Sequence, residues 1–254
     1  MIISIVNFTD SLQDEEVQRV IRAINRQIAQ DFEPYWSMGA TLRLEGHGNT
    51  EDRQAPQELR GDAIIYLWDK AADVPNAIGY HDRNNKGLPY GFVFTDIAKK
   101  VGEPWSVTLS HEALELIGDA EVNVLAAGPN PNDPRQAVYF WYEMCDAVQA
   151  ESYEIDGVAV SNFVLPLYFT VDSEDGSRND FLGSRHNGKL LESFGVNPGG
   201  YVGFFNPATG ENDTFTADAL AQKRMKIKES LKNPRARRVT RYRNLNKAVI
   251  KKAA

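Results

Sequence analysis

The sequence predicts an α+β fold in which a mixed β-sheet packs against helices and is followed by a β-rich extension and a basic tail. The first half of the chain reads as strand, helix, strand, strand, strand, helix. Beyond Glu151 it changes to short β runs and turns, with Asp156-Gly157 as a strong hairpin signal. The 254 residues are 42% hydrophobic and 25% charged, a globular composition that can bury one sizeable core or two small ones.

A strand and a helix are predicted first. Residues 2–8 alternate weakly between apolar and polar positions, which indicates a strand. Asp10 or Ser11 can cap the helix that follows, and acidic residues occupy its first turns, where the helix dipole favours them. Apolar residues then recur at helical spacing to about Ala29, at Val17, Val20, Ile21, Ile24 and Ile28. This pattern predicts a helix with one buried face.

Three more strands and a second helix complete the first half. Strands are predicted at 41–44, 63–68 and 90–95, and the run at 63–68 is apolar enough to lie centrally in a sheet. A polar loop through His81 leads to the strand at 90–95. The second helix is predicted from about Trp105 to Ile117, because Pro104 lies near its start and Gly118 follows it.

The second half of the chain is read as loops and short strands. A proline-rich loop is expected at 128–134, a strand at 137–141 and a hairpin at 153–160. The remaining expected elements are strands at 163–171 and 200–205 and a helix at 217–231. We therefore divide the chain into a domain at residues 1–150, a β-rich extension at 151–215, and a helix with a basic arm at 216–254.

Charge is distributed unevenly along the chain. The net charge of −7 combines +12 between Lys223 and Lys252 with −19 in the preceding 222 residues. The acidic body would repel nucleic acid, while the basic arm would attract phosphate or an acidic surface. We favour packing of the arm on this protein's own body, on another copy or on another protein. Contact with nucleic acid is the alternative, although the arm has too few aromatic residues for a stacking platform.

The single cysteine and the hydropathy of the chain predict a soluble protein in a reducing compartment. Cys145 is the only cysteine, so no disulfide forms within the chain and a reducing compartment fits best. We expect Cys145 to be a small buried residue in a strand-like stretch rather than a nucleophile. The apolar first residues lack a basic flank and read as a strand rather than a signal peptide. We expect a soluble protein without membrane contact, either cytoplasmic or associated with a larger particle.

The second predicted helix carries residues that can hold a metal ion. His111 and Glu115 lie four residues apart, so their side chains project from the same face of the helix. Glu112 is turned away from them and is the candidate general base, since a carboxylate can take a proton from water activated by a divalent ion. Zn²⁺ is the expected ion, although a glutamate in place of the second histidine of zinc peptidases makes Mn²⁺ or Ca²⁺ more competitive.

A catalytic zinc needs a third protein ligand. Asp119 lies two turns beyond His111 on the same face, and Glu121 has the spacing of a ligand placed after a helix-ending glycine. Glu143 and Asp146 lie on a later segment. We favour Glu143 or Asp146, because the aromatic residues before them suggest burial and a buried acid needs a partner.

Five segments resemble an uncharacterised zincin-like family of metallopeptidases that share a serine-His-Glu-x-x-Glu stretch ending in Asp. The matching segments are residues 78–82, 105–119, 142–148, 153–157 and 161–166, so the resemblance covers about residues 60–170. The sequence departs from the family pattern at Ala120, where a proline is usual, and in its basic tail. The resemblance implies a zincin-like fold with His111, Glu115 and acids of residues 143–146 as metal ligands and Glu112 as base.

The resemblance also includes His81. This histidine could approach the metal or stabilise an oxyanion, or it could be a loop residue held by Asp82. The leading hypothesis is a metal-dependent hydrolase that cleaves a peptide or protein substrate lying along the strand at 90–95. The rival hypothesis is a binding or assembly protein, for example in a homo-oligomer or a virion, that keeps the fold without turnover and uses its basic arm for partner contacts.

Overall fold

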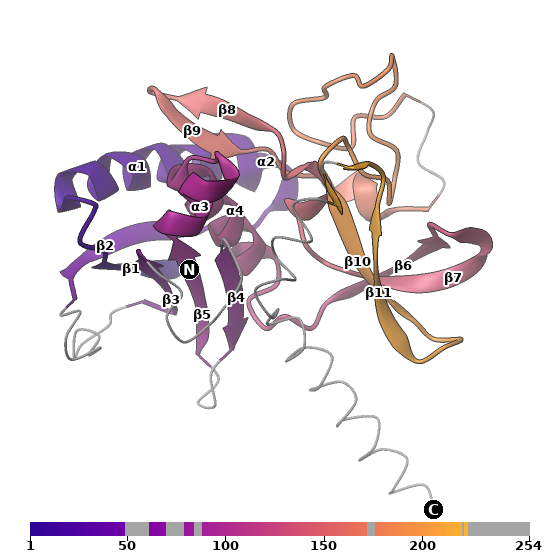
Figure 1. The fold of residues 1–254 in the computed structure, drawn as a ribbon, viewed down its shortest axis with the longest axis horizontal. Helices are drawn as coiled ribbons and strands as arrows, with labels where there is room; N and C mark the ends of the chain where they lie inside the picture. Colours follow the sequence, from indigo (N-terminus) through magenta and orange to yellow (C-terminus); the bar gives the residue numbers. More distant parts are fainter. Residues whose placement is uncertain (49–60, 70–78, 84–87, 172–175, 220, 223–254) are drawn as a thin grey trace, which may run out of the picture.

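The computed structural model describes residues 1–48, 61–69, 79–83, 88–171, 176–219 and 221–222 (Figure 1). The basic arm from Lys223 onward and most of the helix predicted at 217–231 lie outside these residues. None of the helices in the described part of the chain has the length and apolar character needed to cross a bilayer.

A five-stranded mixed sheet forms the first half of the fold. Its order is β2-β1-β3-β5-β4, with β3 in the centre as its apolar sequence predicts. Four strands are parallel and β4 runs antiparallel at one edge. The strands are β1 (Ile2–Phe8), β2 (Thr41–His47), β3 (Ala63–Trp68), β4 (Gly79–Arg83) and β5 (Pro89–Phe94). The predicted polar loop through His81 is thus wrong in part, because residues 79–83 pair with β5.

Helices cover one face of this sheet (Figure 1). Helix α1 (Asp14–Gln27) continues into a π-helix (Ile28–Phe32) and α2 (Glu33–Trp36). Helix α3 (Thr95–Val101), which the sequence analysis missed, leads to α4 (Trp105–Gly118). Inward side chains of the sheet and of both long helices share one buried cluster that includes Ile5, Ile65, Ile24 and Leu114. The sheet and α1 therefore form the support on which α4 rests.

The start of α1 differs from the prediction. Its N-cap residue is Gln13, and no side chain caps the helix there. Instead, the Asp10 backbone N–H donates to Asp69 Oδ2 at 2.6 Å, and the Ser11 hydroxyl donates to the same carboxylate. Asp69 follows β3 directly, so the two residues expected to cap the helix tie the β1–α1 connection to the end of β3.

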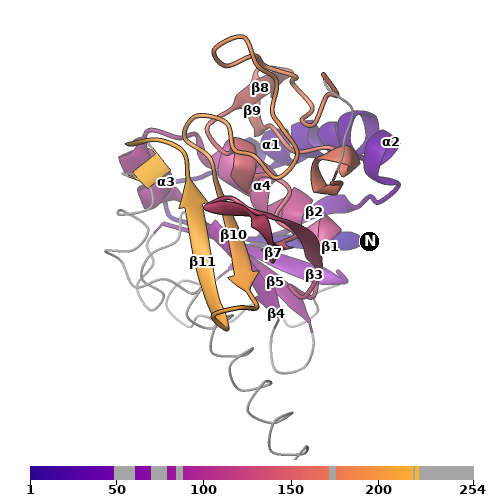
Figure 2. The ribbon, with the colours of Figure 1, turned by 90° about the vertical axis from the view of Figure 1, so that its right-hand side faces the viewer.

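A second, four-stranded antiparallel sheet has the order β11-β10-β7-β6 (Figures 1 and 2). It consists of β6 (Leu125–Asn130), β7 (Asp133–Trp141), β10 (Tyr201–Asn206) and β11 (Glu211–Thr216). The proline-rich segment read as a loop is therefore a hairpin. Pro129 lies in β6, which is an edge strand, where a proline is tolerated because a missing N–H can face away from the ladder.

The hairpin predicted at Asp156-Gly157 is confirmed. Strands β8 (Ser152–Ile155) and β9 (Val158–Ser161) flank these two residues, whose φ angles are 52° and 73°. Positive φ at both positions is the geometry of a tight hairpin turn. The hairpin packs on α4 and α1 (Figure 1).

Residues 163–171 form no strand, contrary to the prediction. Pro166–Phe169 form a short 3₁₀ helix, and Val164 makes an isolated β-bridge with Asp180. Pro166 removes a backbone donor at the point where a strand would continue. The segment instead buries Phe163 and Tyr168 in the core.

The core is continuous across the boundary predicted near residue 150. The same buried cluster contains Ile5 and Leu114 from before this boundary and Val160 and Phe204 from after it. The second sheet also combines strands from both sides of the boundary. These contacts fix the segment around Cys145 between the two halves of the fold.

Candidate metal centre

Helix α4 places His111 and Glu115 side by side. His111 Nε2 lies 3.2 Å from Glu115 Oε2, as the spacing of four residues predicts, and the side chains are only 12% and 5% exposed. The helix begins after Pro104 and ends at Gly118. Its interior is apolar, with Leu114 fully buried, so packing holds the two polar side chains in place.

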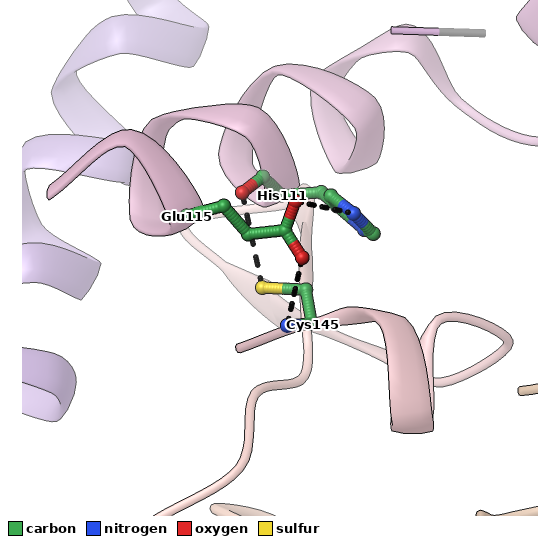
Figure 3. Close-up of side chains that lie close together, drawn as sticks. All are labelled: His111, Glu115 and Cys145. Atoms are coloured by element: carbon green, nitrogen blue, oxygen red, sulfur yellow. Dashed lines mark hydrogen bonds and ion pairs between the residues drawn. The ribbon is translucent and has the colours of Figure 1, made fainter. Parts of the chain in front are cut away.

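The chain that follows β7 crosses α4 and brings Cys145 to these residues (Figure 3). The Cys145 backbone N–H donates to Glu115 Oε1 at 3.1 Å, and its Sγ lies 3.8 Å from the carbonyl oxygen of His111. Met144 packs against Gly118 at this crossing, and a Cβ on Gly118 would lie 2.1 Å from Cε of Met144, so the methionine side chain would have to move. The residue before Cys145 thus contacts the end of the helix.

Three different donor atoms converge at this crossing. One ligand atom each from His111, Glu115 and Cys145 lies within 4.8 Å of the other two. Imidazole nitrogen, carboxylate oxygen and thiolate sulfur are the ligand types that zinc takes in proteins. The residues present thus fit a divalent ion of this kind.

Asp146 adds a second carboxylate to the centre. Its Oδ1 lies 3.4 Å from His111 Nε2, and its side chain is 6% exposed. Burial lowers the pKa of His111, but the charge of Glu115 and the hydrogen bond with Asp146 outweigh burial and hold the pKa well above 6.5. The centre therefore favours positive charge beside His111 Nε2, from a proton or from a metal ion.

The thiol of Cys145 is fully buried. Burial raises the pKa of Cys145, and the charge of His111 acts in the opposite direction with a smaller effect. A free thiol at this position is therefore protonated and a poor nucleophile near neutral pH, as its predicted structural role requires. The expected strand around it is absent, because β7 ends at Trp141 and a 3₁₀ turn begins at Asp146.

The other predicted site residues lie in different surroundings. Both carboxylate oxygens of Asp119 accept backbone N–H groups, from Asn123 at 3.0 Å and from Val124 at 2.9 Å. Glu112 is 5% exposed on α4, Glu143 is half-buried, and Glu121 is exposed. Within the described part of the chain, none of these four acids joins the three-residue group. The backbone of His81, in β4, pairs with Gly91 of β5, and the side chain of His81 lies outside the described part.

The sequence analysis missed Cys145 as a possible ligand. The available signal was its position between Glu143 and Asp146, on the segment already expected to supply the third ligand. A buried structural cysteine and a buried ligand have the same local sequence context. Only the crossing of this segment over α4 separates the two.

Comparison of the chain with models of known protein families gave no match. No curated protein and no solved structure matched either.

Proposed function

We propose that this protein binds a divalent metal ion, zinc foremost, through His111, Glu115 and Cys145, and that it is a zincin-like metal-dependent hydrolase. The observation that carries the proposal is the convergence of these three donors within 4.8 Å on a helix and a segment that crosses it. Asp146, at 3.4 Å from His111 Nε2, can serve as a fourth donor or orient the imidazole.

The ligand set favours zinc over harder ions. Mn²⁺ and Ca²⁺ prefer oxygen ligands, whereas a thiolate selects for softer and borderline metals. Participation of Cys145 thus offsets the competition from harder ions that the glutamate at position 115 introduces. Loss of the thiol should make the site less selective.

The chemistry follows from the neighbouring acid. A bound divalent ion polarises a carbonyl group and lowers the pKa of water. Glu112 follows His111 on the same helix, so its carboxylate can accept a proton from water and return it to the leaving group. Its low exposure keeps bulk water from competing for that proton.

The strand on which a substrate would lie is corrected. Strand β5, which includes residues 90–94, is paired with β3 on one side and with β4 on the other, so no backbone edge remains for a peptide. Strand β4 is the edge of the sheet and contacts α4. An extended peptide could pair with β4 by adding a strand.

A structural metal centre in a binding or assembly protein is the second candidate. The observation in its favour is the low exposure of the donors, from 0% at Cys145 to 12% at His111. If Asp146 also binds, four protein ligands would close the coordination sphere, as in structural zinc sites. Such a site would stabilise the fold without turnover.

Both candidate functions require a metal ion at His111, Glu115 and Cys145. The metal content of protein purified without chelator tests this requirement. We expect about one zinc per chain in the wild type, and loss of zinc in His111→Ala, Glu115→Ala and Cys145→Ala. His47→Ala and Glu121→Ala are matched controls, because both residues are exposed, and they should retain zinc. Zinc absent from the wild type after loading would contradict the proposal.

A second experiment separates the catalytic from the structural centre. In cobalt-loaded protein, a small anion such as azide would change the visible spectrum only if a coordination position is open. If the protein is a hydrolase, the wild type should cleave members of a peptide library. The Glu112→Gln variant should bind the metal but cleave none of them. An unchanged spectrum together with no wild-type cleavage would reject the hydrolase in favour of the structural centre.

A further inference from the structure

A buried polar network lies between the metal centre and helix α1. Gln27, Ser110 and Ser161 are each 0% exposed, although all three side chains are polar. They come from the last residue of α1, from α4 and from the end of β9. Buried polar groups persist in folded proteins only when they are hydrogen-bonded, so their partners determine what the network does.

The side chains of Gln27 and Ser110 bind each other and the backbone of Ser161, at the end of the β8–β9 hairpin. The Ser110 hydroxyl donates to Gln27 Oε1 at 2.8 Å and accepts the backbone N–H of Ser161 at 2.9 Å. Gln27 Nε2 donates to the carbonyl oxygen of Ser161 at 2.8 Å. Both backbone groups of Ser161 are therefore held by side chains from two helices.

The network continues towards the surface through Tyr153. Gln27 Nε2 also lies 3.2 Å from the Tyr153 hydroxyl, which donates to Asp31 Oδ2 at 2.8 Å. Gln27 is the last residue before the π-helix, and Asp31 lies within it. The π-helix thus begins where α1, the β8–β9 hairpin and α4 are joined by these hydrogen bonds. Such wide turns are frequent at functional sites.

The network reaches the metal centre from two directions without supplying a ligand. Ser110 is the residue before His111, so its position fixes the turn of α4 that carries the imidazole. Three residues beyond Ser161, the backbone N–H of Val164 donates to the carbonyl oxygen of Met144 at 2.7 Å, next to Cys145. Gln27 joins these two serines and thereby links the chain segments that bring His111 and Cys145 together.

We propose that Gln27 is a positioning residue of the metal centre, which holds α4 against the hairpin so that His111 and Cys145 keep the separation an ion requires. This inference rests on the proposed metal site. Groups that orient metal ligands through hydrogen bonds commonly contribute ten- to a hundredfold to metal affinity. The same logic gives the serine before His111 a function, since its hydroxyl is the contact between helix and glutamine.

Asn25 provides a matched control for Gln27, because it lies on the same helix and its side-chain amide also binds both backbone groups of one residue. The amide donates to the carbonyl oxygen of Leu42 at 2.9 Å and accepts the Leu42 N–H at 2.7 Å. Leu42 belongs to β2, at the edge of the sheet opposite β4, so this clamp does not reach the metal centre. A purely structural role of Gln27 would give both variants the same outcome.

The test compares zinc dissociation constants, measured by competition with a chromophoric chelator, and the spectra of cobalt-loaded protein. Gln27→Met keeps the side-chain length and removes all three side-chain hydrogen bonds of Gln27, to Ser110, Ser161 and Tyr153. We expect it to weaken zinc binding by about tenfold or more and to shift the thiolate-to-cobalt absorption band. Asn25→Leu should lower stability with the affinity and the band unchanged. Ser110→Ala, which removes only one hydroxyl, gives the same readout if Gln27→Met does not fold.

A double variant sharpens the result. Because Gln27 and Ser110 act through one hydrogen bond, Gln27→Met combined with Ser110→Ala should weaken binding by less than the product of the single effects. Wild-type affinity and spectrum in Gln27→Met would overturn the inference, as would equal losses in Gln27→Met and Asn25→Leu. If the wild-type protein binds no zinc, the proposed metal site itself is refuted. That outcome is distinct from a failure of the role assigned to Gln27.

Discussion

Two buried aspartates near α4 show how single residues of the same type acquire different roles. Asp119 is 7% exposed and uses both oxygens to close the turn after the helix. Asp146 is 4% exposed and lies beside the imidazole of His111. In sequence both are acids at plausible ligand spacing. Their hydrogen bonds separate them, because an oxygen that holds backbone N–H groups is less available to an ion.

Replacement of Asp119 should therefore affect the fold and not the metal. Asp119→Ala removes two buried hydrogen bonds to a charged acceptor, and we expect unfolding to become easier by about 2 kcal/mol. Urea unfolding of the metal-free protein measures this loss, with Glu121→Ala as the exposed control. The zinc content of folded Asp119→Ala should equal that of the wild type. Loss of zinc from a folded variant would make Asp119 a ligand and refute this assignment.

The sequence predicts residue roles only where they depend on local geometry. His111 and Glu115 follow from helical spacing alone, and the structure places them 3.2 Å apart. Cys145 lies 34 positions beyond His111 and reaches the site where its segment crosses α4, with Met144 packed against Gly118. No spacing rule encodes such a crossing, so this part of the site required the three-dimensional structure.

At the scale of elements, Asp69 connects three segments at the carboxyl ends of the parallel strands. It accepts the Thr95 hydroxyl at 2.8 Å in addition to its bonds from Asp10 and Ser11. Partial burial raises the pKa of Asp69, but the hydrogen bonds from Ser11, Thr95 and the Asp10 backbone outweigh it and bring the pKa below 3.8. The ionised carboxylate therefore ties β3 to the starts of α1 and α3.

Protonation of Asp69 in acid should weaken the hydrogen bonds that tie β3 to the starts of α1 and α3. A depressed pKa means that Asp69 contributes stability above its unfolded pKa of about 3.8, and that this contribution is lost as the pH falls through the folded value. We expect Asp69→Asn to cost about 1 kcal/mol at neutral pH and progressively less below pH 4. Denaturant unfolding of both proteins across this range measures the difference. A difference that stays constant in acid would contradict the assignment.

Two strands that the sequence did not predict, β4 and β6, have sequence patterns that argue against a strand. Strand β4 consists of Gly79, Tyr80, His81, Asp82 and Arg83 and has no apolar alternation, so only its pairing with β5 identifies it. Strand β6 contains Pro129, which normally argues against a strand. The apolar and regularly spaced elements β3, α1 and α4 were predicted to within a few residues, because burial and periodicity agree there.

On the scale of the whole molecule, the metal centre joins parts of the chain that are distant in sequence. An ion held by His111 and Cys145 would close a loop of 34 positions and bridge α4 to the segment between the two sheets. Ligand binding to the folded state alone stabilises that state. The metal should therefore stabilise the entire fold, since the single core spans both sheets.

Thermal unfolding with and without zinc measures how much the metal stabilises the fold. Zinc at a hundred times its dissociation constant should stabilise the protein by about 2.7 kcal/mol and raise Tm accordingly, and chelator should reverse the shift. Mg²⁺ is the matched control, because its preference for oxygen ligands disfavours a site with a thiolate. Cys145→Ser should respond to zinc much less than the wild type. A zinc-induced shift equal in both proteins would exclude Cys145 from the site.

The interior position of β1, between β2 and β3, has a consequence for how the protein is made. Strand β1 is the first along the chain, yet both of its neighbours, β2 and β3, are synthesised after α1. A nascent chain on the ribosome thus carries β1 with both backbone edges open and Ile3 and Ile5 uncovered until Trp68 has emerged. Open edges of this kind recruit other chains, and parallel pairing between distant segments is slow. The strand order therefore exposes β1 to pairing with other chains during synthesis until β2 and β3 have joined it.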